Sequence, residues 1–294
     1  MGDRKDHAPA ARTLKWHIDW IRRPVVGCVL IAITLYMLFH GADYFASLYV
    51  FLALTASYEW HRMINRERFR VEAVVTAITV VIALGFLLRW PNPNIAWIVL
   101  LGGVGASLIV SGLRESKAVW QSAGVLYLGI PSLAMVSLYM FADHGAWPAD
   151  QHQQAAKVMI GLFISVWATD TGALVFGNLI GGPKLAPVLS PNKTWAGTLG
   201  GVAVSAIAQT IYIGLLGGNV WAAALYGTGL AVVAHTGDLS ESWVKRKFHV
   251  KDSGSLIPGH GGILDRADST LAAGTFAAVL VLVLGLDPLF GAPL

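Results

Sequence analysis

The residues best suited to chemistry are concentrated in one polar stretch, residues 237–269, of an otherwise apolar chain. Carboxylates there are suitable ligands for hard cations such as Mg²⁺, and the interleaved lysines and arginines suit phosphates. Glycines allow a backbone to approach a ligand or to turn sharply beside it. The charged residues are Asp238, Glu241, Asp252, Asp265, Asp268, Lys245, Arg246, Lys247, Lys251 and Arg266. The combination indicates metal-assisted phosphoryl chemistry at a membrane surface.

The first part of this stretch has helical spacing. Asp238, Ser242 and Lys245 lie at i, i+4 and i+7, which puts them on one stripe of a helix, with Glu241 beside them. A carboxylate, a hydroxyl and an ammonium on one stripe can hold a metal and a phosphate together. A solvated helix end, with cations favoured near its C-terminus, is an equally good interpretation of this segment alone.

The end of the stretch carries a second pair of carboxylates, Asp265 and Asp268, at the start of the last apolar segment. Acidic residues at a helix N-terminus are common because of the helix dipole alone. Two such carboxylates facing Asp238 across a glycine-rich loop are less common, and we favour a metal site. The loop, residues 258–262, reads Pro-Gly-His-Gly-Gly and is either a phosphate-facing turn or a tight return to the membrane; it is not a Walker phosphate loop.

Two upstream features extend the candidate site. Asp170 lies deep in an apolar segment, where an ionisable residue is costly and is functional by default, although a structural Asp satisfied by its neighbours is the alternative. A loop ending in Ser190-Pro-Asn-Lys193-Thr-Trp offers phosphate donors before a helix start. An ordinary basic loop with a capping residue would look the same.

The composition requires these groups to be positioned by membrane helices. Of 294 residues, 55% are hydrophobic and 13% charged, about half the charged fraction of a soluble domain. The single cysteine, Cys28, excludes a disulfide framework. Residues 1–23 are basic, and they form either an interfacial helix or a disordered lead-in. We see no cleavable signal peptide, and we expect residues 24–294 to form one transmembrane catalytic domain.

We predict an all-α polytopic membrane protein with about nine transmembrane helices and a cytosolic catalytic loop between the last two. The spans are Pro24–Phe39, Tyr44–Trp60, Val71–Leu88, Ile95–Leu113, Val119–Phe141, Val158–Ile180, Trp195–Leu216, Val220–His235 and Leu271–Leu286. Of 21 lysines and arginines, only Arg89 and Lys157 fall on the opposite side from the rest. The positive-inside rule then places residues 237–269 in the cytosol, where nucleotides are. Glu59 and Trp60 end the second span; we interpret Trp60 as an interface anchor and leave both out of the site.

At this point the sequence resembles a known family. Ser242-x-Val-Lys245-Arg246, four residues, Lys251-Asp252-x-Gly, then Pro-Gly-His260-Gly-Gly-x-x-Asp265-Arg266-x-Asp268 resembles the signature of phosphatidate cytidylyltransferases, without a mismatch. Asp170-Thr-Gly-Ala and Ser190-Pro-Asn-Lys193-Thr-Trp also resemble family segments, in the expected order. Ala196 stands where the family often has Glu or Gln, so it receives no role. The resemblance covers the C-terminal half well and the N-terminal half only as apolar spans.

The resemblance implies that CTP and phosphatidate give CDP-diacylglycerol and pyrophosphate with Mg²⁺, and it leaves open a second cation. It implies a homodimer in a lipid bilayer, and we expect the bacterial inner membrane, a site facing the cytosol and no nucleic-acid partner. Together, residues and resemblance predict metal binding by Asp238, Asp265 and Asp268, and catalytic roles for these three and Lys245. Substrate binding is predicted for Ser242, Arg246, Lys251, Asp252, His260, Arg266, Ser190, Lys193 and Asp170.

Two alternative functions use the same features differently. A transporter would also have many spans and an intramembrane aspartate, but transporters place their sites near the bilayer midplane between inverted repeats, and we find no repeat. A lipid kinase, or a relative acting on another lipid phosphate, would use a similar site. Release of pyrophosphate from CTP separates cytidylyl transfer from kinase action.

Overall fold

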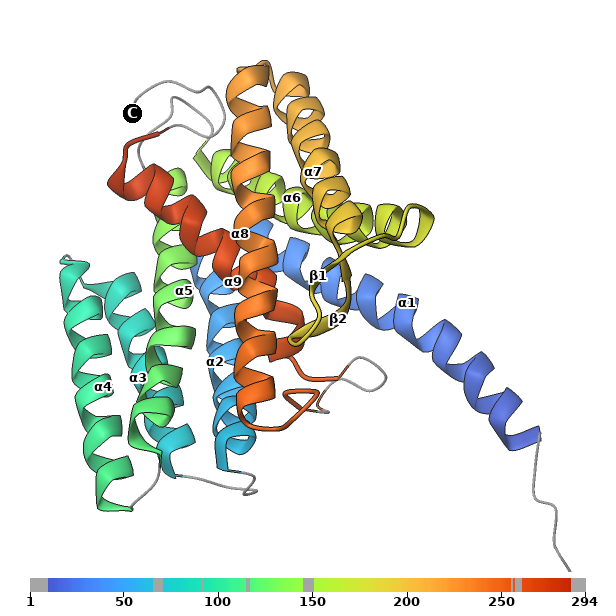
Figure 1. Ribbon diagram of the computed structural model, residues 1–294. Coiled ribbons are helices and arrows are strands. Elements are labelled where there is room, and N and C mark those ends of the chain that lie inside the picture. The colour runs from blue at the N-terminus through green and yellow to red at the C-terminus, as the bar shows by residue number, and fades with distance from the viewer. Residues whose placement is uncertain are drawn as a thin grey trace, which may run out of the picture.

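The computed structural model describes residues 10–65, 71–90, 92–114, 117–144, 151–254, 256 and 261–286. For residues 10–24, 144 and 151–153 it describes the backbone only. Within these residues the protein is all-α apart from one two-stranded hairpin (Figure 1). The helices are α1 (Ala10–Phe39), α2 (Ala42–Asn65), α3 (Val71–Arg89), α4 (Asn94–Leu113), α5 (Ala118–His144), α6 (Gln151–Leu179), α7 (Trp195–Leu215), α8 (Val220–Lys247) and α9 (Leu264–Ala278). A π-helical turn, η1 (Val279–Val283), continues α9, and the strands are β1 (Lys184–Ala186) and β2 (Ser190–Thr194).

Each predicted span falls on one helix, in order, and the prediction of an all-α membrane protein is confirmed. Six of the described helical segments are long and apolar enough to cross a membrane: α3, α4, residues 118–143 of α5, residues 154–179 of α6, α7, and α9 with η1. The apolar part of α1, Val25–Phe39, is shorter. α2 and α8 are not among the six, since α2 carries acidic and basic residues and α8 mixes its apolar residues with Gly, Thr and His. The protein is therefore an integral membrane protein, and the count of nine spans stays a prediction.

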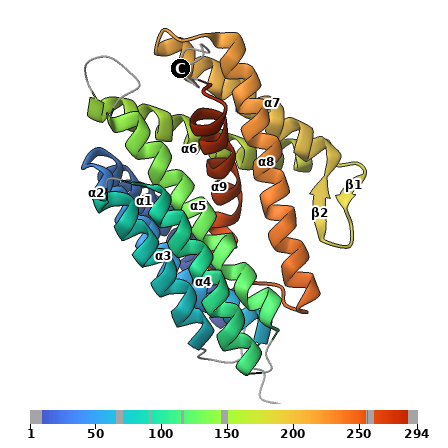
Figure 2. The ribbon, with the colours of Figure 1, turned by 90° about the vertical axis from the view of Figure 1, so that its left-hand side faces the viewer.

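The core lies where α2, α5 and α9 meet. Phe45 and Tyr139 stack with ring centroids 4.8 Å apart, and the Tyr139 hydroxyl donates to the Leu38 carbonyl at 2.9 Å. Figure 2 shows α9 between α5 and α8, so that both helices flank the element carrying Asp265 and Asp268. α6 runs across α5 and α8 rather than along them in both views. The packing thus brings α6, α8 and α9, which carry the predicted acidic residues, together.

Small residues allow the helices around the site to approach closely. A Cβ at Gly172 of α6 would lie 2.9 Å from the Gly200 carbonyl of α7, and one at Gly197 would lie 2.8 Å from the Ala173 carbonyl. At the α8–α9 crossing, a Cβ at Gly237 would lie 2.6 Å from the Ala272 Cβ and 2.9 Å from the Asp268 carbonyl. Backbone contact at these crossings is typical of membrane helices that pack through glycine.

The loop between α6 and α7 is more ordered than the sequence predicted. β1 and β2 pair antiparallel, with Lys184 opposite Thr194 and Ala186 opposite Ser190. The Thr194 side chain then caps α7 by accepting from the Gly197 N–H at 3.1 Å, as an N-terminal Thr is suited to do. The hairpin holds Lys193 at a fixed position beside α8, which an open loop would not.

Candidate active site

α8 continues as helix to Lys247, so the predicted stripe exists. The Asp238 carboxylate forms an ion pair with Lys193 of β2 and accepts from the Ser242 hydroxyl at 3.4 Å. Asp238 is therefore held between a hydroxyl from its own helix and an ammonium from the hairpin. The alternative of a solvated helix end is wrong for this face, because Ser242 is buried and Glu241 is fully buried.

Lys245 joins α8 to α9. Its Nζ lies 3.1 Å from Glu241 Oε2 and 2.9 Å from Asp265 Oδ1. Burial raises the pKa of Glu241 well above its usual range, and the neighbouring Asp268 raises it further. Burial alone would lower the pKa of Lys245, but the Glu241 and Asp265 carboxylates more than offset this and raise it. Lys245 is thus one cation shared by several carboxylates.

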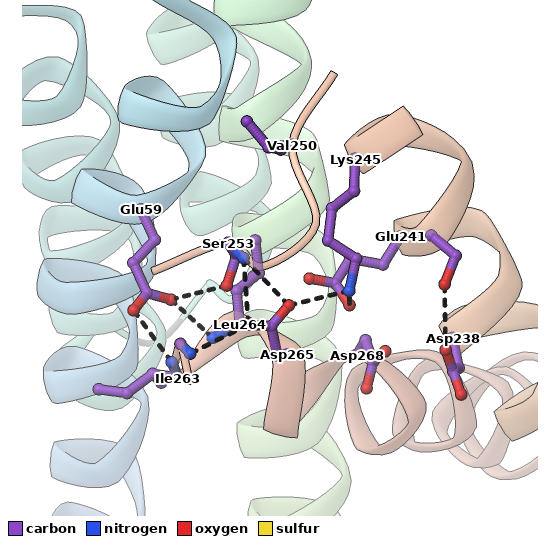
Figure 3. A network of polar contacts seen from close by, with 12 residues as sticks. Glu59, Asp238, Glu241, Lys245, Val250, Ser253, Ile263, Leu264, Asp265 and Asp268 are labelled. Atoms are coloured by element: carbon purple, nitrogen blue, oxygen red, sulfur yellow. Dashed lines mark hydrogen bonds and ion pairs between the residues drawn. The ribbon is translucent and has the colours of Figure 1, made fainter. Parts of the chain in front are cut away.

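Asp265 organises the loop that joins α8 to α9. Its two oxygens accept from the Ser253 N–H at 3.2 and 3.1 Å, and Oδ2 also accepts from the Gly262 N–H at 3.0 Å. Gly261 has φ +87°, a conformation that glycine adopts readily. These bonds, drawn in Figure 3, close both ends of the loop onto the first turn of α9.

Glu59 of α2 is a residue that the sequence analysis missed. It is fully buried, and its carboxylate accepts from the Ile263 N–H at 3.0 Å, the Leu264 N–H at 2.8 Å and the Ser253 hydroxyl at 3.3 Å (Figure 3). It therefore caps the N-terminus of α9 from just over 200 residues away in the sequence. An acidic residue at the end of an apolar span was the available signal in the sequence. The sequence analysis left Glu59 out of the site, and the structure places it against Ser253, which Asp265 also holds.

We expect Glu59→Gln to lower kcat by about 10- to 100-fold, because displacing groups from their reactive geometry has effects of this order. Both Glu59 carboxylate oxygens accept hydrogen bonds from N–H or O–H groups. In Gln one of these oxygens is replaced by an NH₂ group, which cannot accept a hydrogen bond and would repel the donor that faces it. The measurement is steady-state turnover in detergent beside thermal unfolding. A variant with normal kcat would show that this cap does not position the site.

Trp60 is buried in the core and does not lie at the membrane interface, where the sequence analysis placed it. It is 2% exposed, its indole N–H donates to the Trp120 carbonyl at 2.9 Å, and its ring stacks on Tyr127 at 4.8 Å. The interpretation of Trp60 as an interface anchor is therefore wrong: it packs in the core beneath the site.

A polar pocket of about 600 Å³ opens beside Asp238. It is bounded by α6, the hairpin, α7 and α8, and Asp170, Lys193 and His235 line it with Asp238. His235, another residue missed, is 7% exposed, and within the described residues no hydrogen-bond partner reaches its Nε2. Its place among apolar residues in α8 gave no signal of this position. Asp170 thus lines this pocket, and its role in substrate binding stays a prediction.

The remaining predicted residues divide into three groups. Asp268 is buried beside Glu241 and accepts from the Ser269 N–H at 2.7 Å. Arg246 donates to the Leu189 and Val250 carbonyls at 3.3 and 3.2 Å, which ties the hairpin to α8. Lys251, Asp252 and Arg266 are exposed, in or beside the loop that joins α8 to α9. Ser190 is the first residue of β2. His260 lies outside the described residues.

The carboxylate oxygens at this site are the type of ligand that a hard divalent cation prefers. Their side chains are not arranged around a common metal position in this structure. Asp238, Glu241, Asp265 and Asp268 offer oxygen ligands, and Oε1 of Glu241 is buried with no hydrogen-bond partner in the described part of the chain. Within the described residues, no three His, Cys, Asp or Glu side chains converge at metal-binding geometry. Asp238 is instead engaged by Lys193, and Asp265 by Lys245 and backbone N–H groups.

Comparison with known proteins places this site in a family context. A model described as the cytidylyltransferase family matches residues 21–284. A phosphatidate cytidylyltransferase of Brucella suis is 34% identical over 268 residues, covering 88% of this chain and 91% of the relative. One of Staphylococcus epidermidis is 31% identical over 226 residues, covering 74% and 82%, respectively. The similarity thus extends well beyond the polar stretch, into the N-terminal half that carries Glu59.

Proposed function

The chain belongs to the cytidylyltransferase family, and from this premise we propose that it is a phosphatidate cytidylyltransferase of phospholipid biosynthesis. CTP and phosphatidate would give CDP-diacylglycerol and pyrophosphate. The observation that carries the proposal is the Lys193–Asp238 ion pair, which lines a polar pocket. A second pair, Lys245 with Asp265, lies about two turns further along α8. Cations and carboxylates from the hairpin, α8 and α9 thus lie along this part of α8, as a reaction between two polyanionic substrates requires.

We place the CTP polyphosphate in the polar pocket. An ionised oxygen of the phosphatidate phosphate attacks the α-phosphorus of CTP. The bond from that phosphorus to the oxygen bridging to the β-phosphorus breaks, and pyrophosphate leaves with its electron pair. No general base is needed, because the attacking oxygen is already ionised. Lys193 and Lys245 would offset the repulsion between the substrates and orient them for in-line attack.

We propose Asp238, Asp265 and Asp268 as the carboxylates that hold Mg²⁺. When bound, the ion would neutralise and orient the phosphates. Asp265 would bind it by exchanging its contact with Lys245, since its oxygens already accept from Lys245, Ser253 and Gly262. That exchange would free the Lys245 ammonium for a phosphate oxygen. We propose Glu241 as a ligand of a second cation, since within the described residues its Oε1 has no hydrogen-bond partner. A bound cation would favour the ionised carboxylate that burial disfavours.

The placement in the membrane is part of the proposal. We propose nine spans, a homodimer, and a site facing the cytosol from the inner membrane of a bacterium. The distribution of lysines and arginines supports the orientation. Trp120 and Trp243 beside Lys247, whose Nζ lies 4.9 and 5.5 Å from the two ring centroids, also support a water interface at the C-terminal end of α8, because aromatic and basic residues gather there.

The test is transfer of label from CTP to phosphatidate by purified protein in detergent with Mg²⁺. We expect label from the α-phosphate to enter lipid, pyrophosphate to be released, and EDTA to abolish both. Label entering lipid only from the γ-phosphate would make the protein a kinase. Absence of labelling with every phosphorylated lipid tried would overturn the enzymatic proposal and favour transport.

A further inference from the structure

The opposite side of α8 from the polar pocket is hollowed by an apolar groove. This groove, the α5–α8 groove, is lined by residues of α5, α8 and α9. Figure 2 shows α9 between the other two helices. Its volume is about 630 Å³. Its lining includes Tyr127 and Ile130 of α5, Val233 and Ser240 of α8, and Asp268 and Thr275 of α9.

The head of the groove lies at the candidate active site. Asp268 is the one charged side chain among the described residues that line the groove. It lies beside Glu241, and it is close enough to Asp238 for the two carboxylates to repel each other. The polar pocket and the apolar groove therefore end at neighbouring carboxylates on either side of α8.

A second apolar cavity, of about 750 Å³, adjoins the groove at the end away from the site. Ile130 and Thr275 line both cavities, and the second extends to Trp90 and Trp97 without a charged residue among its described lining. Asp268 and Thr275 are seven residues apart on one helix, which is about 10 Å along its axis. One leaflet's hydrocarbon is about 15 Å thick, so this length of α9 is about two thirds of a leaflet, and the second cavity lies beyond it.

We propose that the α5–α8 groove receives one acyl chain of the phosphatidate substrate. This rests on the proposed function, and it assigns lipid and nucleotide to opposite sides of α8. The chain lies along α9, and the lipid phosphate stands at the Asp268 end, where it meets the nucleotide at Asp238. The lining beyond Thr275 therefore senses chain length.

The test narrows the groove at the junction of the two cavities. Thr275→Phe adds bulk from α9, and Ile130→Trp adds bulk from α5, at the two positions that line both cavities. Val232→Phe is the matched control, because Val232 is 48% exposed and lines neither cavity, although its neighbour Val233 does. Each variant is assayed with dioctanoyl and dipalmitoyl phosphatidate at saturating CTP and Mg²⁺.

We expect the ratio of kcat/KM for dipalmitoyl over dioctanoyl phosphatidate to fall about tenfold in both groove variants, the order that pocket contacts with alkyl groups discriminate. The KM for CTP and the ratio in Val232→Phe should stay unchanged. An unchanged ratio in variants that still process dioctanoyl phosphatidate would overturn the groove assignment, as would an equal loss on both lipids in both variants. If the unaltered protein labels neither lipid, the proposed function itself fails.

Discussion

Asp238→Asn is expected to lower kcat/KM for cytidylyl transfer by about 10³-fold, the order seen when one electrostatic partner of a reacting centre is removed. Asn preserves size but removes the charge that pairs with Lys193 and, by our proposal, with Mg²⁺. It also leaves the ammonium of Lys193 without its counter-ion at the pocket edge. The measurement is initial-rate kinetics with Mg²⁺ varied.

The matched control for this prediction is Asp43→Asn. Asp43 also pairs with a cation, Arg89, whose Nη1 is 2.8 Å from Oδ1, but the pair is exposed and belongs to the N-terminal end of α2, away from Glu59. Because exposed ion pairs contribute little, we expect a change within twofold. Near-normal turnover by Asp238→Asn at saturating Mg²⁺ would contradict the role of Asp238.

Gly262→Ala is expected to lower turnover by at least about 10²-fold, because a displacement near 1 Å at a reacting centre has this effect. An added Cβ would lie 2.7 Å from Glu59 Oε2 and 2.8 Å from the Gly254 backbone nitrogen, while the Ser253 hydroxyl also lies in its way. The hydroxyl can rotate, but the backbone can yield only if the loop shifts. Such a shift would break the bond from the Gly262 N–H to Asp265.

Gly105→Ala of α4 provides the comparison for this prediction, assayed by turnover and thermal unfolding. Among the residues that the structure describes, no neighbouring atom lies within 4 Å of the Cβ that it would add. Its stability should be kept or slightly raised, since Ala favours helix over Gly. If Gly262→Ala turned over substrate as fast as Gly105→Ala, the tight packing around Glu59 would have no bearing on catalysis.

The parts of the site that the sequence predicted are those set by local periodicity. Asp238, Ser242 and Lys245 share a stripe because α8 continues through them, and Asp265 and Asp268 fall on the first turns of α9. The family resemblance added the reaction. Their mutual distances depend on helix crossings at residues such as Gly237, which no local pattern specifies.

The parts that the sequence did not predict are long-range contacts. Glu59 meets Ile263 and Leu264 only because α2 packs behind the loop, and a span end with Glu and Trp has more ordinary interpretations. Lys193 was identified as a phosphate donor, but its pairing with Asp238 depends on a short hairpin in a segment that the sequence analysis treated as a loop. Glu241 is buried because α9 covers that face of α8, and its helical spacing alone did not show this.

The central claim is that carboxylates of α8 and α9 together hold the divalent cation on which transfer depends. The most direct measurement is binding of Mn²⁺, as a paramagnetic substitute for Mg²⁺, followed by electron paramagnetic resonance in the intact protein, in Asp238→Asn and in Asp268→Asn. The account predicts saturable binding that Mg²⁺ displaces, weakened at least tenfold in both variants and unchanged in Asp43→Asn. Equal Mn²⁺ affinity in all four proteins would contradict it.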